Sequence, residues 1–308
     1  MEQHKRPLVT LRMLTYNHER YIAQAIKGAL NQTYSPLEII ISDDASTDKT
    51  WEVILKHTEK YKGPHKVIIN RNITNLGVAN HLDKIQKISN GLISVGAAGD
   101  DISDPERVEK IVEEFNKDNW SKKSYFSNAY IMDAFDNVSK LYFHDRPMFY
   151  QSVIDLINDH KSLKRNLFPN DIWQLGATSA FHRDLYESFK KVNNKSLQDD
   201  GVYAFRALLL GGIGYIEKPL VYYRKHSESI SSLGSVNSIK FFMTRQKYYK
   251  LNQLVDAKTV AESNEQLIRI MTLRYKLSVI KSVIFSLPFF ASLYFILRNL
   301  KNKYQIAK

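Results

Sequence analysis

The chain contains no cysteine, which excludes disulfide bonds, thiolate metal sites and a cysteine nucleophile. It also lacks three glycine-containing motifs: the phosphate loop GxxxxGK(S/T), a GxGxxG fingerprint after its first strand-like run, and the GxSxG nucleophile elbow. These absences argue against a P-loop NTPase, a dinucleotide-dependent oxidoreductase and an α/β-hydrolase. The N-terminus has no long apolar core and no small-residue cleavage site, so we expect no secretory signal.

The positive charge is unevenly distributed along the chain. Of a formal net charge of +12, most lies in residues 236–308, which contain 13 Lys or Arg and three Asp or Glu. Within the apolar run 277–297 the only charged residue is Lys281, and basic residues beside Phe, Leu and Tyr favour an anionic membrane surface over a nucleic acid as partner. Pro288 interrupts the run and both flanks are basic, which favours a helix lying in the membrane interface over one that crosses it. A helix packed on the rest of the protein is the alternative.

Strand and helix patterns alternate through the first 135 residues of the chain. Strand-like apolar runs cover 8–14, 37–42, 66–70, 91–98 and 124–132, and amphipathic patterns between them predict helices from about residue 18, after Asp48, over 78–88 and after Asp104. This alternation predicts an α/β fold: a Rossmann-like, mainly parallel sheet flanked by helices. The stretch 136–235 is less regular, with a late strand expected at 215–226.

Polar residues follow each of the first four predicted strands. They are Tyr16 and Asn17, Asp43 and Asp44, Asn75 and Gly77, and Asp100 and Asp101. Ligands of such sheets bind beyond the carboxyl ends of the strands, so these four loops predict one site. The adjacent carboxylates of Asp100 and Asp101 repel each other, and carboxylates suit Mg²⁺ or Mn²⁺ better than zinc. The pair therefore indicates a divalent cation; a solvated helix N-terminus is the alternative.

Four strings occur in order at familiar spacings: LTYNHERYIAQAIKGALNQTY (14–34), EIIISDDASTDKT (38–50), NITNLGVANHLDKI (72–85) and GAAGDDI (96–102). Together they resemble the nucleotide-sugar half of family-two inverting glycosyltransferases with the A-type fold. QDDGVYAFR and YYRKHSESIS extend the similarity to about residue 232. The resemblance implies a catalytic domain over 1–235, with a nucleotide-sugar half at 1–135 and an acceptor half at 136–235, and then a helical, membrane-associating region at 236–308.

The resemblance also implies roles for individual residues. Nucleotide-sugar contacts are expected from Tyr16, Asn17, Glu19, Asp44, Asn75, Gly77, Asp100 and Arg206. Asp101 is the expected metal ligand, joined by His226, and Ala98 stands where the commoner motif has a further Asp. Asp200 is the expected general base, beside Asp199 in the acidic pair, and Trp173 is expected on the acceptor side. A helix-capping aspartate for Asp200, a surface histidine for His226 and a core tryptophan for Trp173 are the structural alternatives.

The implied activity is inverting transfer of a hexosyl or deoxyhexosyl group from a nucleotide-diphosphate sugar to a hydroxyl of a glycan or lipid-linked acceptor, assisted by Mn²⁺ or Mg²⁺. The implied setting is bacterial surface polysaccharide, capsule or lipopolysaccharide assembly, at the cytoplasmic face of the cell membrane and without a nucleic-acid partner. A nucleotidylyltransferase of similar fold and a non-catalytic nucleotide-sugar-binding protein are the alternatives. The former usually carries a Gly-rich loop with Arg or Lys after its first strand, and TYNHERY lacks one. The sequence leaves the donor sugar, the nucleobase and the oligomeric state open.

Overall fold

The computed structural model describes residues 6–145, 147, 149–161, 174–193, 195–196, 199–226 and 236–287. The chain divides into two compact units, Met1–Lys191 with Asp200–Lys225, and Val192–Asp199 with His226–Lys308. The described part of the first unit contains the sheet, and that of the second contains two long helices.

Nine strands form one sheet in the described part of the first unit. They are β1 (Val9–Thr15), β2 (Leu37–Asp43), β3 (Lys66–Arg71), β4 (Ile93–Ala98), β5 (Ile102–Ser103), β6 (Ser124–Met132), β7 (Val138–Leu141), β8 (Ser179–His182) and β9 (Ile213–Arg224). The order is β3-β2-β1-β4-β8-β6-β9-β5, and β7 pairs with β6. Strands β1 to β4 are parallel, whereas β8 runs antiparallel to both β4 and β6. The predicted α/β class is confirmed. Most of the paired residues are in parallel ladders, and the antiparallel strands are β8, β5 against β9, and β7 against β6.

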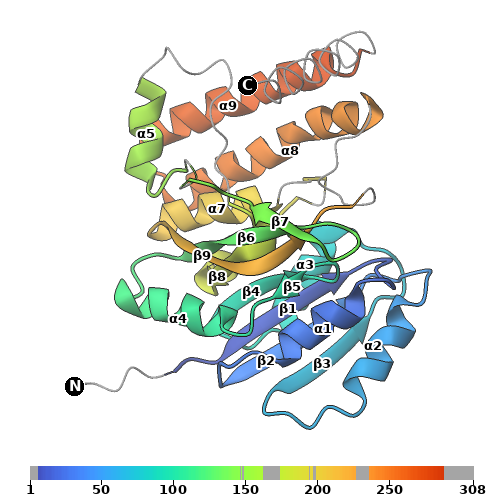
Figure 1. The fold of residues 1–308 in the computed structure, drawn as a ribbon. Helices are drawn as coiled ribbons and strands as arrows, with labels where there is room; N and C mark the ends of the chain where they lie inside the picture. Colours follow the sequence, from blue (N-terminus) through green and yellow to red (C-terminus); the bar gives the residue numbers. More distant parts are fainter. Residues whose placement is uncertain are drawn as a thin grey trace. The chain divides into compact units, whose positions relative to one another are not determined.

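Helices cover this sheet. The first unit contains α1 (Ile22–Leu30), α2 (Thr50–Thr58), α3 (Val78–Ile88), α4 (Arg107–Lys117), α5 (Val153–Lys161), the 3₁₀ turn η2 (Gly176–Thr178), α6 (Asp184–Glu187) and α7 (Asp199–Leu210). In Figure 1, α1 and α2 lie side by side over the parallel strands β1 to β3. The helix predicted from about residue 18 begins at Ile22, because the His18 carbonyl accepts the N–H groups of Tyr21 and Ile22 in a preceding turn.

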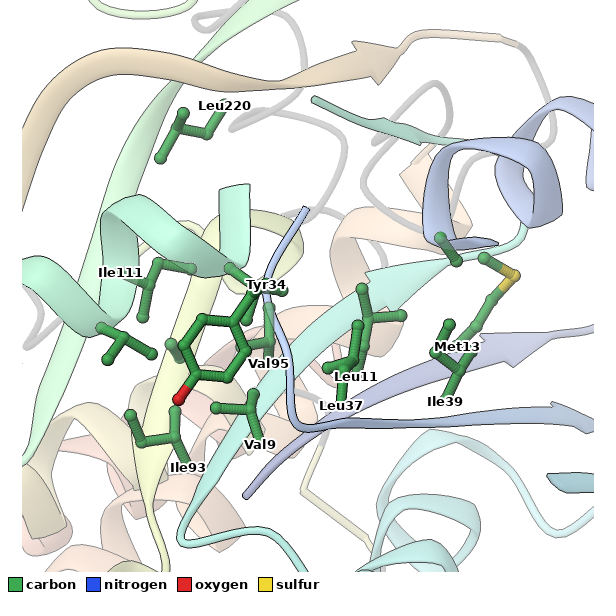
Figure 2. Packing of buried hydrophobic residues seen from close by; sticks show 14 of the residues in the cluster. Val9, Leu11, Met13, Tyr34, Leu37, Ile39, Ile93, Val95, Ile111 and Leu220 are labelled. Carbon is green, nitrogen blue, oxygen red and sulfur yellow. The ribbon is translucent and has the colours of Figure 1, made fainter. Parts of the chain in front are cut away.

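The two faces of β1 bury different kinds of side chain, apolar on one face and polar on the other. Val9, Leu11 and Met13 belong to the apolar core, and Figure 2 shows them in one layer with the core side chains of β2, β4 and α4. The intervening Thr10 and Arg12 are equally buried but polar. Their hydrogen bonds cross to neighbouring strands, since Thr10 Oγ1 donates to Glu38 (3.1 Å) and Arg12 Nε donates to Ser94 (2.8 Å). Strand β1 is therefore apolar on one face and carries hydrogen-bonded polar side chains on the other.

Stability is expected to fall in mild acid because of His81 on α3. This side chain is 2% exposed and contacts Ser42. Burial lowers the pKa of His81, with Lys84 acting in the same direction and Asp44 and Asp43 opposing. The unfolded chain then binds a proton that the folded chain does not, so the free energy of unfolding decreases as pH falls below about 6.5. Urea melts at pH 7.5 and 5.5 should show a smaller loss in His81→Gln than in the wild type; an equal loss in both would contradict this origin.

The second unit contains α8 (Val236–Val260) and α9 (Glu265–Ile284), which pack against each other. Asn264 caps α9 by accepting the N–H of Leu267 at 3.0 Å. Among the described helices, none combines the length and the apolarity needed to cross a membrane. Of the apolar run predicted at 277–297, residues 288–297 lie outside the described part of the chain.

Candidate active site

The loops that follow β1 and β2 are tied together at the carboxyl edge of the sheet. Asn17 has a left-handed backbone with φ of 54°, and its Oδ1 accepts the N–H of Thr47 at 2.9 Å. Glu19 Oε2 accepts the N–H of Lys49 at 3.0 Å. Tyr16 is next to these hydrogen-bonded residues in the sequence and is 42% exposed, which leaves ring surface available to a ligand. Both Asn17 and Glu19 therefore shape the loops beside Tyr16 through contacts within the chain.

Asp44 organises the loop that follows β3. Its carboxylate is 4% exposed and accepts three hydrogen bonds, from Asn72 Nδ2 (2.7 Å) and from the N–H groups of Leu76 and Gly77 (2.9 Å each). Gly77 has φ of 71°, a left-handed conformation that favours glycine, and Asn75 Oδ1 also accepts its N–H at 3.0 Å. The structure thus brings together Asp44, Asn75 and Gly77, as predicted for one site. Their contacts with a nucleotide sugar stay a prediction.

The turn after β4 presents the two neighbouring carboxylates differently. Asp101 is 6% exposed, and its Oδ1 accepts the N–H of Arg224 at 2.8 Å. The Arg224 side chain, itself buried, donates from Nε to the carbonyl of Asp100 at 2.8 Å. Burial, and then the charge of Asp100, raise the pKa of Asp101 well above its usual range. Asp101 therefore locks the turn to the end of β9, while Asp100 is the more accessible of the two.

His18 faces the accessible Asp100. Its Nδ1 lies 3.2 Å from Thr15 Oγ1, and its Nε2 lies 3.9 Å from Asp100 Oδ2. A Cβ at Gly99 would come within 2.8 Å of His18 Nδ1 and 2.3 Å of Thr15 Oγ1, so this close approach requires glycine at position 99. The hydroxyl on Nδ1 orients the ring, as hydrogen-bond partners of metal-binding histidines commonly do.

Three potential ligand atoms gather here. One atom each from His18, Asp100 and His226 lies within 4.8 Å of the others. A set of two imidazoles and a carboxylate fits a Mn²⁺-type ion with open positions for further oxygen ligands. The predicted His226 is in this group; the assignment of Asp101 as ligand stays a prediction.

Asp200 lies in a second part of the site, at the start of α7. The charge of Asp200 adds to burial in raising the pKa of Tyr142, which places the carboxylate near that phenol. The ring of Tyr142 also lies 5.4 Å from Lys225 Nζ and 5.5 Å from the ring of Tyr223. Tyr142 is therefore the common neighbour of Asp200 and of the strand end that leads to His226.

A buried arginine connects the two parts. Arg107 Nη2 donates to the carbonyl of Gly96 on β4 (2.6 Å) and to that of Ala177 in η2 (2.9 Å). Next to Ala177, a Cβ on Gly176 would meet Asp200 Oδ2 at 3.0 Å. Arg107 thus fixes the turn that supports Asp200 to the strand that ends at the acidic pair.

The remaining predicted residues fall outside this arrangement or outside the described residues. Arg206 is 2% exposed, donates to the carbonyls of Leu185 (3.1 Å) and Lys190 (2.5 Å), and lies over the ring of Phe189 at 4.8 Å. These contacts give it a structural role, and its donor contact stays a prediction. Trp173 and the side chain of Asp199 are not among the described residues.

Three kinds of contributor carry no signal in the sequence. His18 is a lone histidine in a loop and has no characteristic spacing, although it stands in the loop after the first strand. Arg224 and Arg107 act through backbone carbonyls and N–H groups, which a motif does not record. Gly99 was read as part of an acidic motif, whereas its contribution is the missing side chain.

Comparison with known proteins supports a family assignment. The model of the family described as Glycosyl transferase family 2 matches residues 10–189. An uncharacterized glycosyltransferase of Haemophilus influenzae is 26% identical over 293 residues, covering 91% of this chain and 85% of the relative. A chondroitin synthase of Escherichia coli is 32% identical over 112 residues, which is 36% of this chain and only 16% of that protein.

Solved structures show the same fold at low sequence identity. The mannosyltransferase PcManGT from Pyrobaculum calidifontis, in complex with GDP-Man and Mn²⁺, superposes with a TM-score of 0.59 at 17% identity, covering 96% of this chain and 81% of the other. S. aureus TarS in complex with UDP gives a TM-score of 0.57 at 14% identity, covering 87% of this chain and 71% of the other. At such identities the likeness establishes the architecture alone.

Proposed function

The chain belongs to glycosyl transferase family 2 and is a glycosyltransferase; from this premise we propose that it transfers a hexosyl or deoxyhexosyl group, with inversion and metal assistance, from a nucleotide-diphosphate sugar to an acceptor hydroxyl. The observation that carries the proposal is the grouping of His18, Asp100 and His226 at the carboxyl edge of the sheet, with Asp200 nearby beside Tyr142. Similar folds bind UDP in one solved protein and GDP-Man with Mn²⁺ in another, so both nucleotide classes are candidates here.

In the proposed donor half, Tyr16 contacts the nucleobase and the loop organised by Asp44 encloses the nucleotide, with the glycine backbone at Gly77 permitting close approach. His18, Asp100 and His226 would hold a divalent cation, with Asp101 fixing the turn through Arg224. A bound Mn²⁺ or Mg²⁺ supplies charge neutralisation to the diphosphate leaving group.

In the proposed acceptor half, Asp200 takes the proton of the acceptor hydroxyl. As that oxygen forms its bond to the anomeric carbon, the bond from this carbon to the diphosphate oxygen breaks and the nucleoside diphosphate leaves. A base on the face opposite the leaving group produces inversion in one displacement. Asp199 and Trp173 are also proposed to contribute to the acceptor side of the site.

The proposed acceptor is a glycan or a lipid-linked saccharide, and the proposed setting is surface polysaccharide, capsule or lipopolysaccharide assembly at the cytoplasmic face of the membrane. The match to a segment of a chondroitin synthase supports a glycan-building role. The basic, apolar C-terminal region supports the membrane location.

Donor binding can be tested by a thermal-shift screen of UDP-, GDP- and dTDP-sugars with and without Mn²⁺. A ligand at about 100 times its Kd adds about 2.7 kcal/mol of stability, so the matching donor should raise Tm by about 5 °C, more with the metal than without. Stabilisation by one nucleotide class with Mn²⁺ identifies the donor. No stabilisation by any of them would contradict the proposal.

Gly176→Ala is expected to slow transfer by about tenfold, because the added methyl group displaces the Asp200 side chain. Displacing a catalytic group by 1 Å can lower the reaction rate by up to about 100-fold. The KM for the donor and the Tm should change little, since the new Cβ meets a carboxylate at 3.0 Å and not backbone atoms. Steady-state kinetics at saturating donor would measure this. A wild-type turnover number in the variant would show that Asp200 does not act from this position.

A further inference from the structure

Helix α9 carries large apolar side chains on its outer surface. Leu273 is 58% exposed, Leu277 47%, Ile280 56%, Val283 61% and Leu287, just beyond the helix end, 52%. Their spacing of three or four residues places them on one side of the helix. Roughly the last three turns of α9, with Leu287 just beyond them, thus present an apolar stripe that is larger than the isolated exposed hydrophobic residues of an ordinary surface.

The buried side of the same stretch is polar. Arg274, Ser278 and Ser282 are each 6% exposed or less. The two serine hydroxyls donate to helix carbonyls three residues earlier, at 2.7 Å for Ser278 and 2.9 Å for Ser282. In a helix of a water-soluble protein the apolar stripe faces the core. Here the pattern is inverted, which indicates that the outer stripe has an apolar partner.

Charge selects the kind of partner. No acidic residue follows Glu265 in the sequence, while eight Lys or Arg do. Of the described ones, Arg269 and Lys276 are exposed on α9 together with the stripe. Arg269 and Lys276 lie three or four residues from Leu273 and so fall on the same side of the helix as the stripe. Exposed basic groups among apolar side chains match the boundary between acyl chains and anionic headgroups.

We propose that the outer stripe of α9, formed by Leu273, Leu277, Ile280, Val283 and Leu287, inserts into the headgroup boundary of an anionic lipid bilayer with the helix lying parallel to its surface. A second copy of the chain is a poorer partner, because its stripe would bring like charges together. The proposal sharpens the membrane location given above by naming the attachment surface, and it does not depend on the transfer reaction.

Vesicle flotation with the full chain tests this proposal. Wild-type protein should float with vesicles of phosphatidylcholine and phosphatidylglycerol, float much less with phosphatidylcholine alone, and be released in part by salt. Ile280→Glu and Val283→Glu should each reduce the partition coefficient by about tenfold, because a carboxylate replaces inserted apolar surface. Val260→Glu, on a valine that is 37% exposed at the end of α8, is the matched control and should stay within about twofold of wild type.

Circular dichroism and Tm would confirm that the variants fold, and nucleoside diphosphate release from a donor in vesicle-free solution should remain at the wild-type level. Loss of vesicle binding with intact donor turnover supports the surface. Vesicle binding without donor turnover in the wild type would refute the proposed function and leave the surface standing. Three results would overturn the proposed surface: the wild type does not float, both glutamate variants float as well as the wild type, or the wild type forms a dimer that Ile280→Glu dissociates.

Discussion

Replacing Asp200 with asparagine is expected to reduce the turnover number for sugar transfer by about 10²–10⁴-fold, the usual contribution of a general base. Asparagine keeps the size of the side chain and its place at the start of α7, but it cannot accept the hydroxyl proton at neutral pH. Asp200 lies near Tyr142 and next to Gly176, whereas the proposed nucleotide contacts come from the loops that follow β1 to β3. Donor-induced stabilisation in the thermal-shift assay should therefore stay nearly unchanged.

Asp184→Asn is the matched control for this substitution. Asp184 likewise stands at the start of a helix in the same unit, but it pairs with Lys123 at 2.8 Å. Its loss is expected to alter turnover by less than about twofold, as for most surface substitutions. If Asp200→Asn retains wild-type turnover, or if it loses donor binding in parallel with turnover, Asp200 is not the base.

The second large effect is expected from Asp100→Asn, which should lower Mn²⁺-dependent donor turnover by about 100-fold or more, since a metal contributes several kcal/mol to charge stabilisation. The amide has the shape of the carboxylate but lacks the charge that binds a cation. Donor stabilisation should lose its Mn²⁺ dependence as well. The hydrogen bond from Arg224 Nε goes to the backbone carbonyl of Asp100, which the substitution leaves in place, so the Tm without ligand should change little.

Pulsed EPR gives a readout of this site that does not depend on activity. Nitrogen couplings from imidazole should appear in the spectrum of bound Mn²⁺ and weaken in His18→Gln, because the structure directs His18 Nε2 toward Asp100. His57→Gln, on the exposed surface of α2, should leave the couplings unchanged. Bound Mn²⁺ with unaltered nitrogen couplings in His18→Gln would exclude His18 as a ligand.

The sequence predicted the parallel half of the sheet well, because β1, β2 and β4 are short runs rich in apolar residues and bounded by polar turns. It did not predict β7 or β8. Each has only four residues, and β8 owes its strand conformation to β4 and β6, from which it is distant in the sequence. Short strands of this kind carry no periodic signal of their own.

For the site, the alternation of strands and helices in the sequence predicted which loops meet, but it did not predict which atoms of those loops face each other. Asp100 and Asp101 are equivalent in the sequence, yet one accepts a backbone N–H of Arg224 and the other faces His18. That difference depends on the pairing of β5 with β9, which brings Arg224 against the turn. Similarly, Asp44 was expected to contact a ligand, and the structure adds that it holds the loop 72–77 through three hydrogen bonds.

The most direct measurement is nucleoside diphosphate release from the donor class selected by the thermal-shift screen, with EDTA and with Mn²⁺ added back. A metal-assisted transferase should release the nucleoside diphosphate; the release should stop with EDTA, resume with Mn²⁺ and be lost in Asp200→Asn. Pyrophosphate release from a nucleoside triphosphate and a sugar phosphate would instead indicate a nucleotidylyltransferase. No release from any donor with Mn²⁺, or release that EDTA does not diminish, would contradict a metal-assisted transferase.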